Sequence, residues 1–177
     1  MCHTKPYAFG SLRLYGDKMN LYLKQQFFSW GDKFFIYDAG GNEKYYVEGE
    51  IFSFGKKLHI YDLSDNEVAY IEQRLFSFFP RYTIYKGNDA VAEVTKEFSF
   101  FKQEYTVEGT GWSVLGDFFD HEYEITKHGA PVAEVSKQWF TLGDAYEIFI
   151  NEDSGADEVT VLATVLVIDA CIEAENN

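Results

Sequence analysis

A histidine surrounded by carboxylates is the part of this sequence that comes nearest to a metal site. His121 lies in the segment "GDFFDHEYE" (116–124), together with Asp117, Asp120, Glu122 and Glu124. Imidazole and carboxylate groups bind divalent cations, but alternate side chains of a strand face opposite sides, so only part of this set can converge. A cation site stays open as an alternative. The favoured interpretation is a solvated charged loop, and no metal ligand is predicted.

The other histidines and the glycines give no stronger evidence of a metal or cofactor site. No helical or zinc-ligand spacing relates the remaining histidines, which are His3, His59 and His128. The segment "GTGWSVLGDFF" (109–119) fits neither a P-loop nor a dinucleotide fingerprint, although it contains Gly109, Gly111 and Gly116. A kinked strand or a bulge explains these glycines better than a phosphate site does. No cofactor is therefore expected.

No nucleophile stands in a catalytic context. A GxSxG elbow is absent, and local hydrogen bonding is expected for three serines between aromatic residues, Ser29, Ser53 and Ser77. The two cysteines, Cys2 and Cys171, lie at opposite ends of the chain and are interpreted as incidental thiols. Cys171 is expected to behave as a small buried hydrophobe. These observations predict no catalytic residue and favour a reducing, cytoplasmic location.

The composition of the chain limits the possible fold classes and binding partners. The chain has 177 residues, 46% of them hydrophobic and 19% aromatic, which argues against disorder and favours strands. Its formal charge of −14 would repel phosphate backbones, so nucleic acid is excluded as a partner. The same charge disfavours anionic lipid. Only folding can show whether scattered lysines gather on one side, among them Lys24, Lys33, Lys56, Lys96 and Lys137.

The chain is built from repeats. Three segments recur every 24 residues: "FFSWGDKFFIYD" (27–38), "IFSFGKKLHIYD" (51–62) and "LFSFFPRYTIYK" (75–86). A second similarity, 41 residues apart, relates 82–100 to 123–141 and pairs Lys86 with Lys127. Each unit alternates apolar and polar residues around a turn rich in Gly, Asn and Asp, the pattern of a β-hairpin. About ten to twelve strands would close most simply into a barrel, whose interior then needs filling.

The apolar run "VTVLATVLVI" (159–168) is predicted to fill that interior. It is too short to cross about 30 Å of hydrocarbon as a helix, so no transmembrane segment is expected. Extended to about 157–172 it is too long for an average strand, and a helix apolar on every side is a buried one. Ser154 and Asp157 have the spacing of a capping box. Asp169 at the other end is expected to find a hydrogen-bond donor, because burying it unpaired would cost several kcal/mol.

The N-terminal residues lack the periodic pattern of the rest of the chain. Residues 1–18 show no signal-peptide core and are expected to be unstructured or additional, with a first strand at 11–15 as the alternative. Met19 opens the periodic sequence. A single barrel domain is therefore predicted for residues 19–175.

The serial "FS[FW]G…IYD" hairpins, followed by one apolar C-terminal helix ending on an Asp, resemble the LURP-one-related family, including its bacterial YxjI-like members. The resemblance covers about residues 19–172. It implies a fold similar to the tubby C-terminal domain, a closed barrel of about twelve antiparallel strands around a central hydrophobic helix. Relatives in that superfamily bind phosphoinositides through basic residues, but no such site can be matched here, and no enzymatic activity is implied.

Two functions of different classes are compatible with these features. The preferred one is a non-enzymatic binding or scaffold protein that holds an unknown protein or small-molecule ligand through outer grooves or loops, because surface aromatic residues are many. The alternative is a membrane-associated, phosphoinositide-binding or scramblase-like module. An enzyme with its site at the barrel mouth near Asp169 is a third and weaker hypothesis. No ligand-binding residue is predicted.

Overall fold

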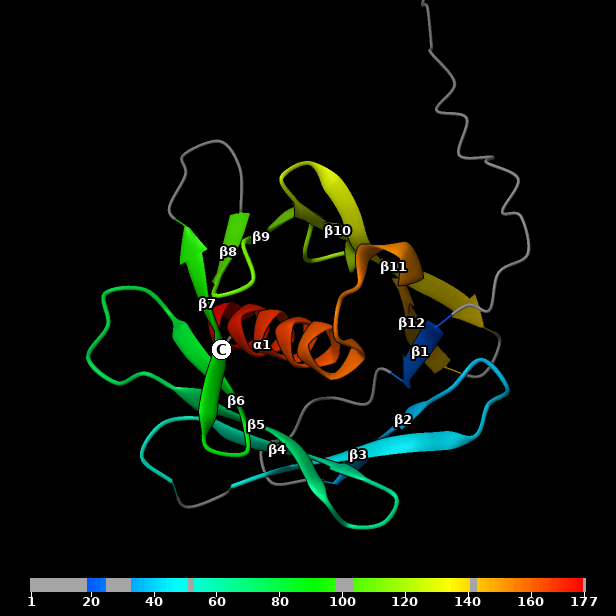
Figure 1. The fold of residues 1–177 in the computed structure, drawn as a ribbon, viewed down its shortest axis with the longest axis horizontal. Coiled ribbons are helices and arrows are strands. Elements are labelled where there is room, and N and C mark those ends of the chain that lie inside the picture. Colours follow the sequence, from blue (N-terminus) through cyan, green and yellow to red (C-terminus); the bar gives the residue numbers. More distant parts are fainter. Residues whose placement is uncertain (1–18, 25–32, 51–52, 98–103, 141–142, 177) are drawn as a thin grey trace, which may run out of the picture.

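Twelve antiparallel strands close into a barrel around one helix (Figure 1). The computed structural model describes residues 19–24, 33–50, 53–97, 104–140 and 143–176. In these residues the strands are β1 (Met19–Lys24), β2 (Phe34–Tyr37), β3 (Glu43–Gly49), β4 (Lys57–Asp62), β5 (Glu67–Gln73), β6 (Arg81–Lys86), β7 (Asp89–Glu97), β8 (Glu104–Glu108), β9 (Trp112–Asp117), β10 (Glu122–Lys127), β11 (Ala130–Phe140) and β12 (Gly143–Ile150). A short 3-10 helix, η1 (Glu152–Ser154), precedes α1 (Glu158–Asn176). The predicted barrel with a central helix is confirmed.

Each strand pairs with the strand before and after it in the sequence, and the first pairs with the last. β1 lies between β2 and β12, in a register that sets Met19 opposite Ile150 and Lys24 opposite Ala145. Because every repeat is a hairpin, this one long-range pairing is enough to close the sheet and remove its free edges. The 1–18 segment, including the alternative strand at 11–15, lies outside the described residues.

The period of two in the sequence becomes the inside and outside of the barrel. In β4 the inward Leu58 and Ile60 are buried, while His59 between them points outward to Glu50 and Glu67. The outward faces carry many tyrosines, such as Tyr61 and Tyr70. Aromatic residues on both faces explain why the alternation in the sequence is imperfect.

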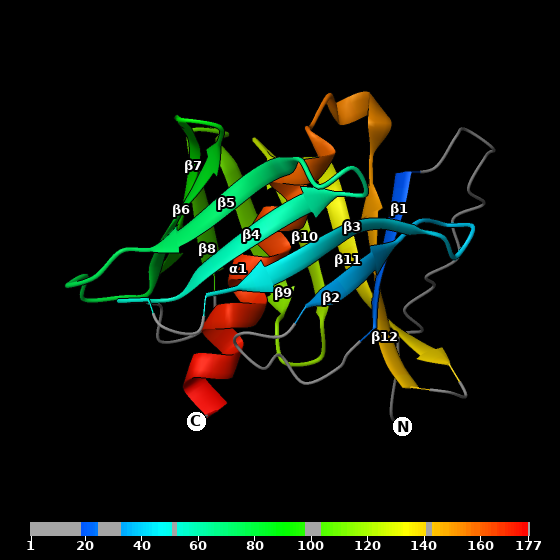
Figure 2. The same cartoon turned by 90° about the horizontal axis from the view of Figure 1, so that it is seen from below.

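Helix α1 fills the interior on all sides (Figures 1 and 2). Val161, Leu162, Ala163 and Thr164 are all fully buried, and four consecutive residues, about 100° apart, together surround the helix. At about 25 cal/mol per Å² of apolar surface, each such Leu or Val contributes about 1.5–3 kcal/mol when it leaves water. The Thr164 hydroxyl donates to the carbonyl of Thr160 at 2.9 Å, as expected for a threonine inside a buried helix.

The predicted N-cap of the helix was wrong, although the predicted start at about residue 157 lies next to the observed one at Glu158. Ser154 does not cap α1: its hydroxyl donates to the carbonyl of Asn151 at 2.5 Å and closes η1. Gly155 then adopts a left-handed φ of 65°, which ends η1 and prevents a continuous helix. Asp157 itself is the cap, because its Oδ2 accepts the backbone N–H of Thr160 at 2.8 Å. The helix therefore runs over Glu158–Asn176 rather than 157–172.

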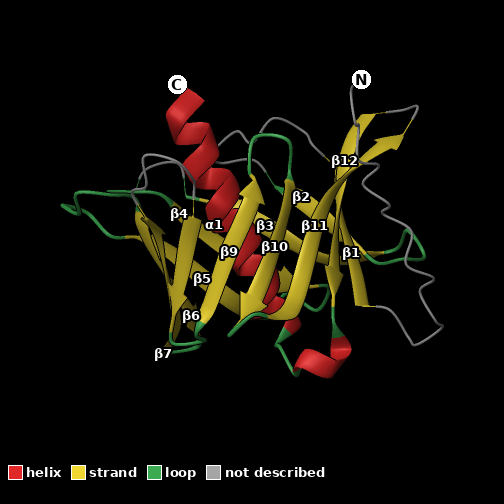
Figure 3. Cartoon of the chain, turned by 90° about the horizontal axis from the view of Figure 1, so that it is seen from above, coloured by secondary structure: helices red, strands yellow, loops and turns green. Residues whose placement is uncertain are grey.

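The two ends of the barrel differ in what they hold. The helix-entry end carries the short turns at 38–42, 63–66, 87–88, 109–111 and 128–129, together with the start of α1. The helix-exit end carries the described loop residues 53–56, 74–80 and 118–121, and α1 leaves the barrel there (Figures 2 and 3). At the entry end Glu158 is anchored to β3 by Lys44 at 2.7 Å and by the Tyr45 hydroxyl at 2.8 Å.

Candidate functional site

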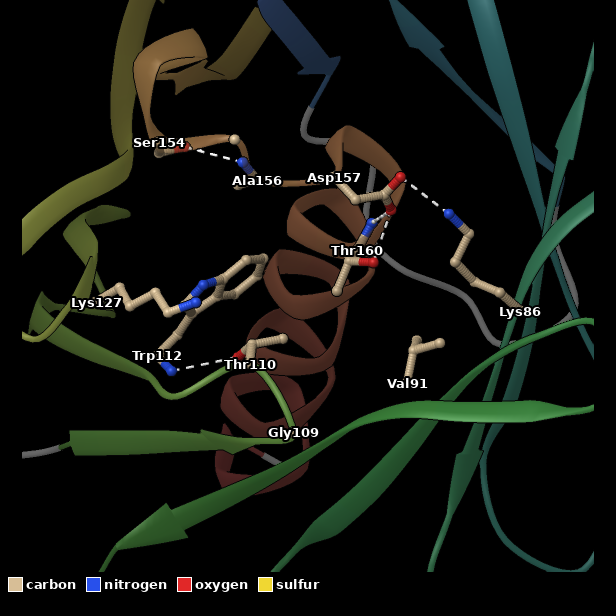
Figure 4. Close-up of a pocket in the computed structure, with 11 residues that line it drawn as sticks. Lys86, Val91, Gly109, Thr110, Trp112, Lys127, Ser154, Ala156, Asp157 and Thr160 are labelled. Carbon is tan, nitrogen blue, oxygen red and sulfur yellow. Dashed lines mark hydrogen bonds and ion pairs between the residues drawn. The ribbon is translucent and has the colours of Figure 1, made fainter.

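A pocket of about 340 Å³ opens at the helix-entry end, between the start of α1 and the barrel wall. We call it the entry pocket (Figure 4). The wall side is formed by the ends of β6 and β10, the start of β7 and the β8–β9 turn, and the helix side by residues 154–157 and Thr160. Its polar and aromatic side chains are Lys86, Thr110, Trp112, Lys127, Ser154, Asp157 and Thr160.

Two lysines at equivalent positions of the sequence repeat line this pocket. Lys86 is the last residue of β6 and Lys127 the last residue of β10. Both strands run toward the helix-entry end and turn there, so the duplication places two ammonium groups at the rim of one cavity. The equivalence of Lys86 and Lys127 is visible in the sequence, and it is the signal by which this site could have been predicted.

The two lysines differ in whether they form an ion pair in the described structure. Lys86 Nζ lies 2.9 Å from Asp157 Oδ1. Partial burial raises the pKa of Asp157, but the hydrogen bonds from Lys86 and Thr160 outweigh it and hold the pKa below its usual 3.8. Lys127, in contrast, is exposed and has no ion-pair partner among the residues that the structure describes. One positive charge of the pocket is therefore uncompensated.

The β8–β9 turn supplies the apolar and hydroxyl part of the pocket. Trp112 is buried and presents its indole to the cavity (Figure 4). The Thr110 hydroxyl donates to the carbonyl of Val107 at 2.9 Å and accepts the backbone N–H of Trp112 at 3.2 Å, which fixes the turn. Gly109 has a φ of 89°, and a Cβ there would lie 2.7 Å from the carbonyl oxygen of Val91, so the turn packs closely on β7.

Asp169 has the hydrogen-bond donor that was expected for it. Its Oδ2 accepts a hydrogen bond from the hydroxyl of Tyr146 on β12. His121 Nε2 lies 3.4 Å from Asp169 Oδ1, and the imidazole stacks on the Tyr146 ring with centroids 4.7 Å apart. The Asp169 side chain is only 8% exposed. The helix is thus tied to the barrel wall at the exit end by a buried polar contact.

The tyrosines around Asp169 are strongly shielded from water. Burial and the nearby Asp169 carboxylate raise the pKa of Tyr123 and of Tyr146 well above the usual 10. The Tyr123 hydroxyl has no hydrogen-bond partner among the described residues. Phe118 fills the space between the Tyr105 and Tyr123 rings, with centroid distances of 4.8 and 5.1 Å.

The acidic segment 116–124 does not come together as a metal site. Asp117 accepts the backbone N–H of Asp120, Glu122 accepts that of Lys137, and His121 turns inward to Asp169. Across the described ranges, no three His, Cys, Asp or Glu side chains are grouped so that they could hold a metal ion. His121 therefore has a structural partner that no local spacing could have indicated.

The remaining candidates occupy structural positions. Gly116 has a φ of 150°, and a Cβ there would lie 2.4 Å from the carbonyl oxygen of Glu122, so it marks a close approach of β9 to β10. The hydroxyls of Ser53 and Ser77 bond locally, to the carbonyls of Gly55 and Arg74. His128 sits in a turn with a φ of 50°. These expectations are confirmed, whereas Ser29, His3 and Cys2 lie outside the described residues.

Cys171 is buried, and burial raises the pKa of its thiol to about 12, as expected of an inert interior cysteine. Three of the scattered lysines form ion pairs in the described part of the chain. Lys33 pairs with Glu48 on the outer wall, and Lys56 and Lys96 pair with acids in the last turns of α1, Glu173 and Glu175. Lys137 lies on β11, and nothing is described of the Lys24 side chain.

A closed barrel of twelve antiparallel strands around one buried C-terminal helix defines the structural class. The model of one family, described as LURP-one-related, matches residues 19–169. The chain belongs to this family. The matched region begins at the first residue of β1 and ends at Asp169, inside α1.

Two known proteins are similar to this chain over most of its length. The uncharacterized protein YxjI of Bacillus subtilis (strain 168) is 37% identical over 148 residues, which cover 84% of this chain and 91% of YxjI. An Arabidopsis thaliana protein with an X-ray structure superposes with a TM-score of 0.61 at 14% identity, covering 90% of this chain and 92% of that one. The similarity to the Arabidopsis protein supports the fold alone. Neither name specifies an activity.

A bilayer-spanning helix is not found in the described part of the chain, because none there is both long enough and apolar enough.

Proposed function

We propose that this protein is a non-enzymatic binding protein and that its ligand site is the entry pocket. The observation that carries the proposal is the exposed Lys127 ammonium, which has no ion-pair partner in the described chain and stands at the rim of a cavity walled by Trp112. A ligand with one anionic group and a flat apolar portion would satisfy both features. Small-molecule sites of this volume combine apolar walls with a few placed polar groups in the same way.

The lining supports binding rather than turnover. Asp157, the carboxylate of the pocket, is committed to capping α1 and to Lys86, so it is poorly placed to act as a general base. The Ser154 hydroxyl donates to Asn151 and accepts the backbone N–H of Ala156 at 3.1 Å, so it is held as part of a turn. Neither group has the adjacent base that an activated nucleophile requires.

The test is a ligand screen on the whole chain, using inorganic phosphate and a set of aromatic carboxylates and aromatic phosphates. Stabilisation is read as an increase in Tm, because a ligand that binds only the folded state shifts the unfolding equilibrium. Because the chain has three tryptophans, the difference in tryptophan fluorescence between the wild type and Trp112→Phe gives a second signal from within the pocket. A hit should raise the Tm of the wild type and of Lys33→Met, and should lose most of that effect in Lys127→Met.

Lys33→Met is the matched control, because Lys33 pairs with Glu48 on the outer wall, away from the pocket lining. Lys127→Met itself should unfold like the wild type without ligand, since Lys127 has no ion pair to lose in the described structure. Ligands that stabilise the wild type and Lys127→Met equally would contradict the proposed site. A turnover of any screened compound that disappears in one pocket variant would contradict the non-enzymatic assignment.

A further inference from the structure

Two hydrogen-bond donors of the entry pocket come from directly opposite residues of neighbouring strands. Lys127, the last residue of β10, is paired in register with Trp112, the first residue of β9. Side chains at such positions project from the same face of an antiparallel pair, with Cβ atoms about 5 Å apart. The register therefore brings the Lys127 ammonium and the Trp112 indole to the same side of the pocket (Figure 4).

The indole N–H of Trp112 is a buried donor without an acceptor. Trp112 is only 6% exposed, and in the described part of the chain no oxygen accepts a hydrogen bond from its Nε1. Buried tryptophan N–H groups usually find a partner, since leaving one unpaired costs free energy. Because Trp112 lines the entry pocket, an acceptor can reach this nitrogen from a ligand held there.

The second lysine of the pocket shows which group Lys127 lacks. Lys86 occupies the equivalent position in the repeated sequence, and its Nζ lies 2.9 Å from Asp157 Oδ1. Asp157 belongs to the segment that leads into α1, which is not part of the repeat. The repeat thus supplies two equivalent lysines, and the protein places a carboxylate on one of them.

The charged groups of the lining leave room for one negative charge. Lys86, Lys127 and Asp157 are its charged residues, so two cations face one carboxylate. A ligand with a single carboxylate neutralises the remaining charge. A second carboxylate at the Lys86 end would meet Asp157, and like charges at such short distances repel each other. The net charge of −14 on the chain opposes a second negative group as well.

We infer that the entry pocket selects a monocarboxylate with an apolar ring, an inference that rests on the proposed function of this pocket. One carboxylate oxygen accepts a hydrogen bond from the Lys127 ammonium and the other from the Trp112 N–H. Asp157 determines the specificity, because it occupies Lys86 and so limits the ligand to one carboxylate. A phosphate monoester fits less well, since it carries a charge of about −1.5 to −2 at neutral pH.

The experiment is calorimetric titration of the full chain with benzoate and with terephthalate, which has the same ring and a second carboxylate at the far end. The wild type should bind benzoate, and terephthalate about threefold or more weakly. Lys127→Met and Trp112→Phe should each weaken benzoate binding by about tenfold, because each removes a donor to a charged group. Lys33→Met, on the outer wall, is the control and should bind benzoate like the wild type.

Asp157→Asn tests the specificity directly. Asparagine caps a helix about as well as aspartate, so α1 keeps its N-cap while Lys86 loses its carboxylate. This variant should bind terephthalate about fivefold or more tightly than the wild type does, and benzoate with a smaller gain. Asp153→Asn, an exposed acid outside the pocket lining, is the matched control and should change neither affinity. Far-UV circular dichroism and Tm show that each variant is folded.

Phenyl phosphate separates this inference from the proposed function. If Lys127 holds phenyl phosphate while benzoate does not bind, the pocket remains a ligand site and the carboxylate assignment is overturned. Terephthalate binding that is equally tight in the wild type and in Asp157→Asn would overturn the role of Asp157. Absence of benzoate binding to a folded wild type would also overturn this inference, whereas the proposed site itself fails only if no anion of the wider screen stabilises the chain.

Discussion

The hydroxyl of Tyr146 on β12 donates a hydrogen bond to the carboxylate of Asp169 on α1, inside the helix-exit end of the barrel. This contact joins the central helix to the strand that closes the barrel against β1. His121 completes the arrangement from the β9–β10 turn. Three distant parts of the chain therefore meet at one carboxylate.

Asp169→Asn should destabilise the fold by about 1–3 kcal/mol, since it weakens a buried charge-assisted hydrogen bond to Tyr146. Tyr146→Phe should cost a similar amount, and the double variant should cost less than the two together because both remove the same interaction. Urea unfolding of all four proteins measures this coupling. Tyr61→Phe, on the outer wall, is the control and should change little. Strictly additive effects of the two substitutions would show that the contact contributes nothing.

Asp157→Ala should destabilise α1 by about 1 kcal/mol, the usual value of a helix N-cap. The exposed neighbour Asp153 caps nothing with its side chain in the described structure, so Asp153→Ala is the control. The pKa of Asp157 is lowered by folding, so its contribution is present above its ordinary pKa of 3.8 and is lost as pH falls through the lower folded value. The difference in stability between wild type and Asp157→Ala should therefore shrink in acid. A difference that grows in acid would contradict this assignment.

Tyr123→Phe should leave stability at neutral pH unchanged or slightly increased, because it removes a buried hydroxyl that has no partner in the described chain. Folding raises the pKa of Tyr123 well above 10, so the folded state holds the proton more tightly and stability falls as pH rises above about 10. The Phe variant should lose less stability between neutral pH and about pH 11 than the wild type. Absorbance in the near ultraviolet, followed with unfolding, tests whether this tyrosine ionises only when the chain unfolds.

Gly116→Ala should destabilise the protein by roughly 3 kcal/mol or more, because the added Cβ meets the backbone of Glu122 and Tyr123 in addition to an unfavourable φ. Gly87→Ala is the matched comparison. Gly87 has a φ of 59° but open space around it, so only the conformational cost of about 1 kcal/mol applies. Thermal unfolding of both variants separates steric contact from backbone strain. Equal losses would mean that the strands separate easily at Gly116.

The fold could be predicted because its information is local and repeated. The turn after Tyr37 and the turn after Tyr61 have the same structure: Asp38 and Asp62 each accept the backbone N–H two and four residues later. Such turns specify hairpins without reference to the rest of the chain. The apolar run at 159–168 predicted the buried helix for a similar reason, because its length and apolar composition can be seen without knowing the rest of the chain.

The entry pocket had a sequence signal in the equivalence of Lys86 and Lys127, but the polar contacts of Asp169 and the N-cap of α1 could not be predicted in the same way. A hydrogen-bond donor was expected for Asp169, but its identity was not. Tyr146 and His121 are 23 and 48 residues away in the sequence, and only the closed barrel brings them to Asp169. His121 was weighed as a metal ligand because its sequence neighbours are acidic, whereas its spatial neighbours are Tyr146 and Asp169. The cap was misplaced onto Ser154 because the left-handed Gly155 separates it from α1.

The central position of α1 also has a consequence for synthesis of the chain. The segment that fills the core, Glu158–Asn176, and the strand that closes the sheet, Gly143–Ile150, are both made after every other strand. Hairpins such as β4–β5 can pair as they leave the ribosome, but a hollow sheet open at β1 has no interior to support it. The barrel therefore completes its folding only once the helix has been released from the exit tunnel, and until then its apolar inner wall needs protection from aggregation.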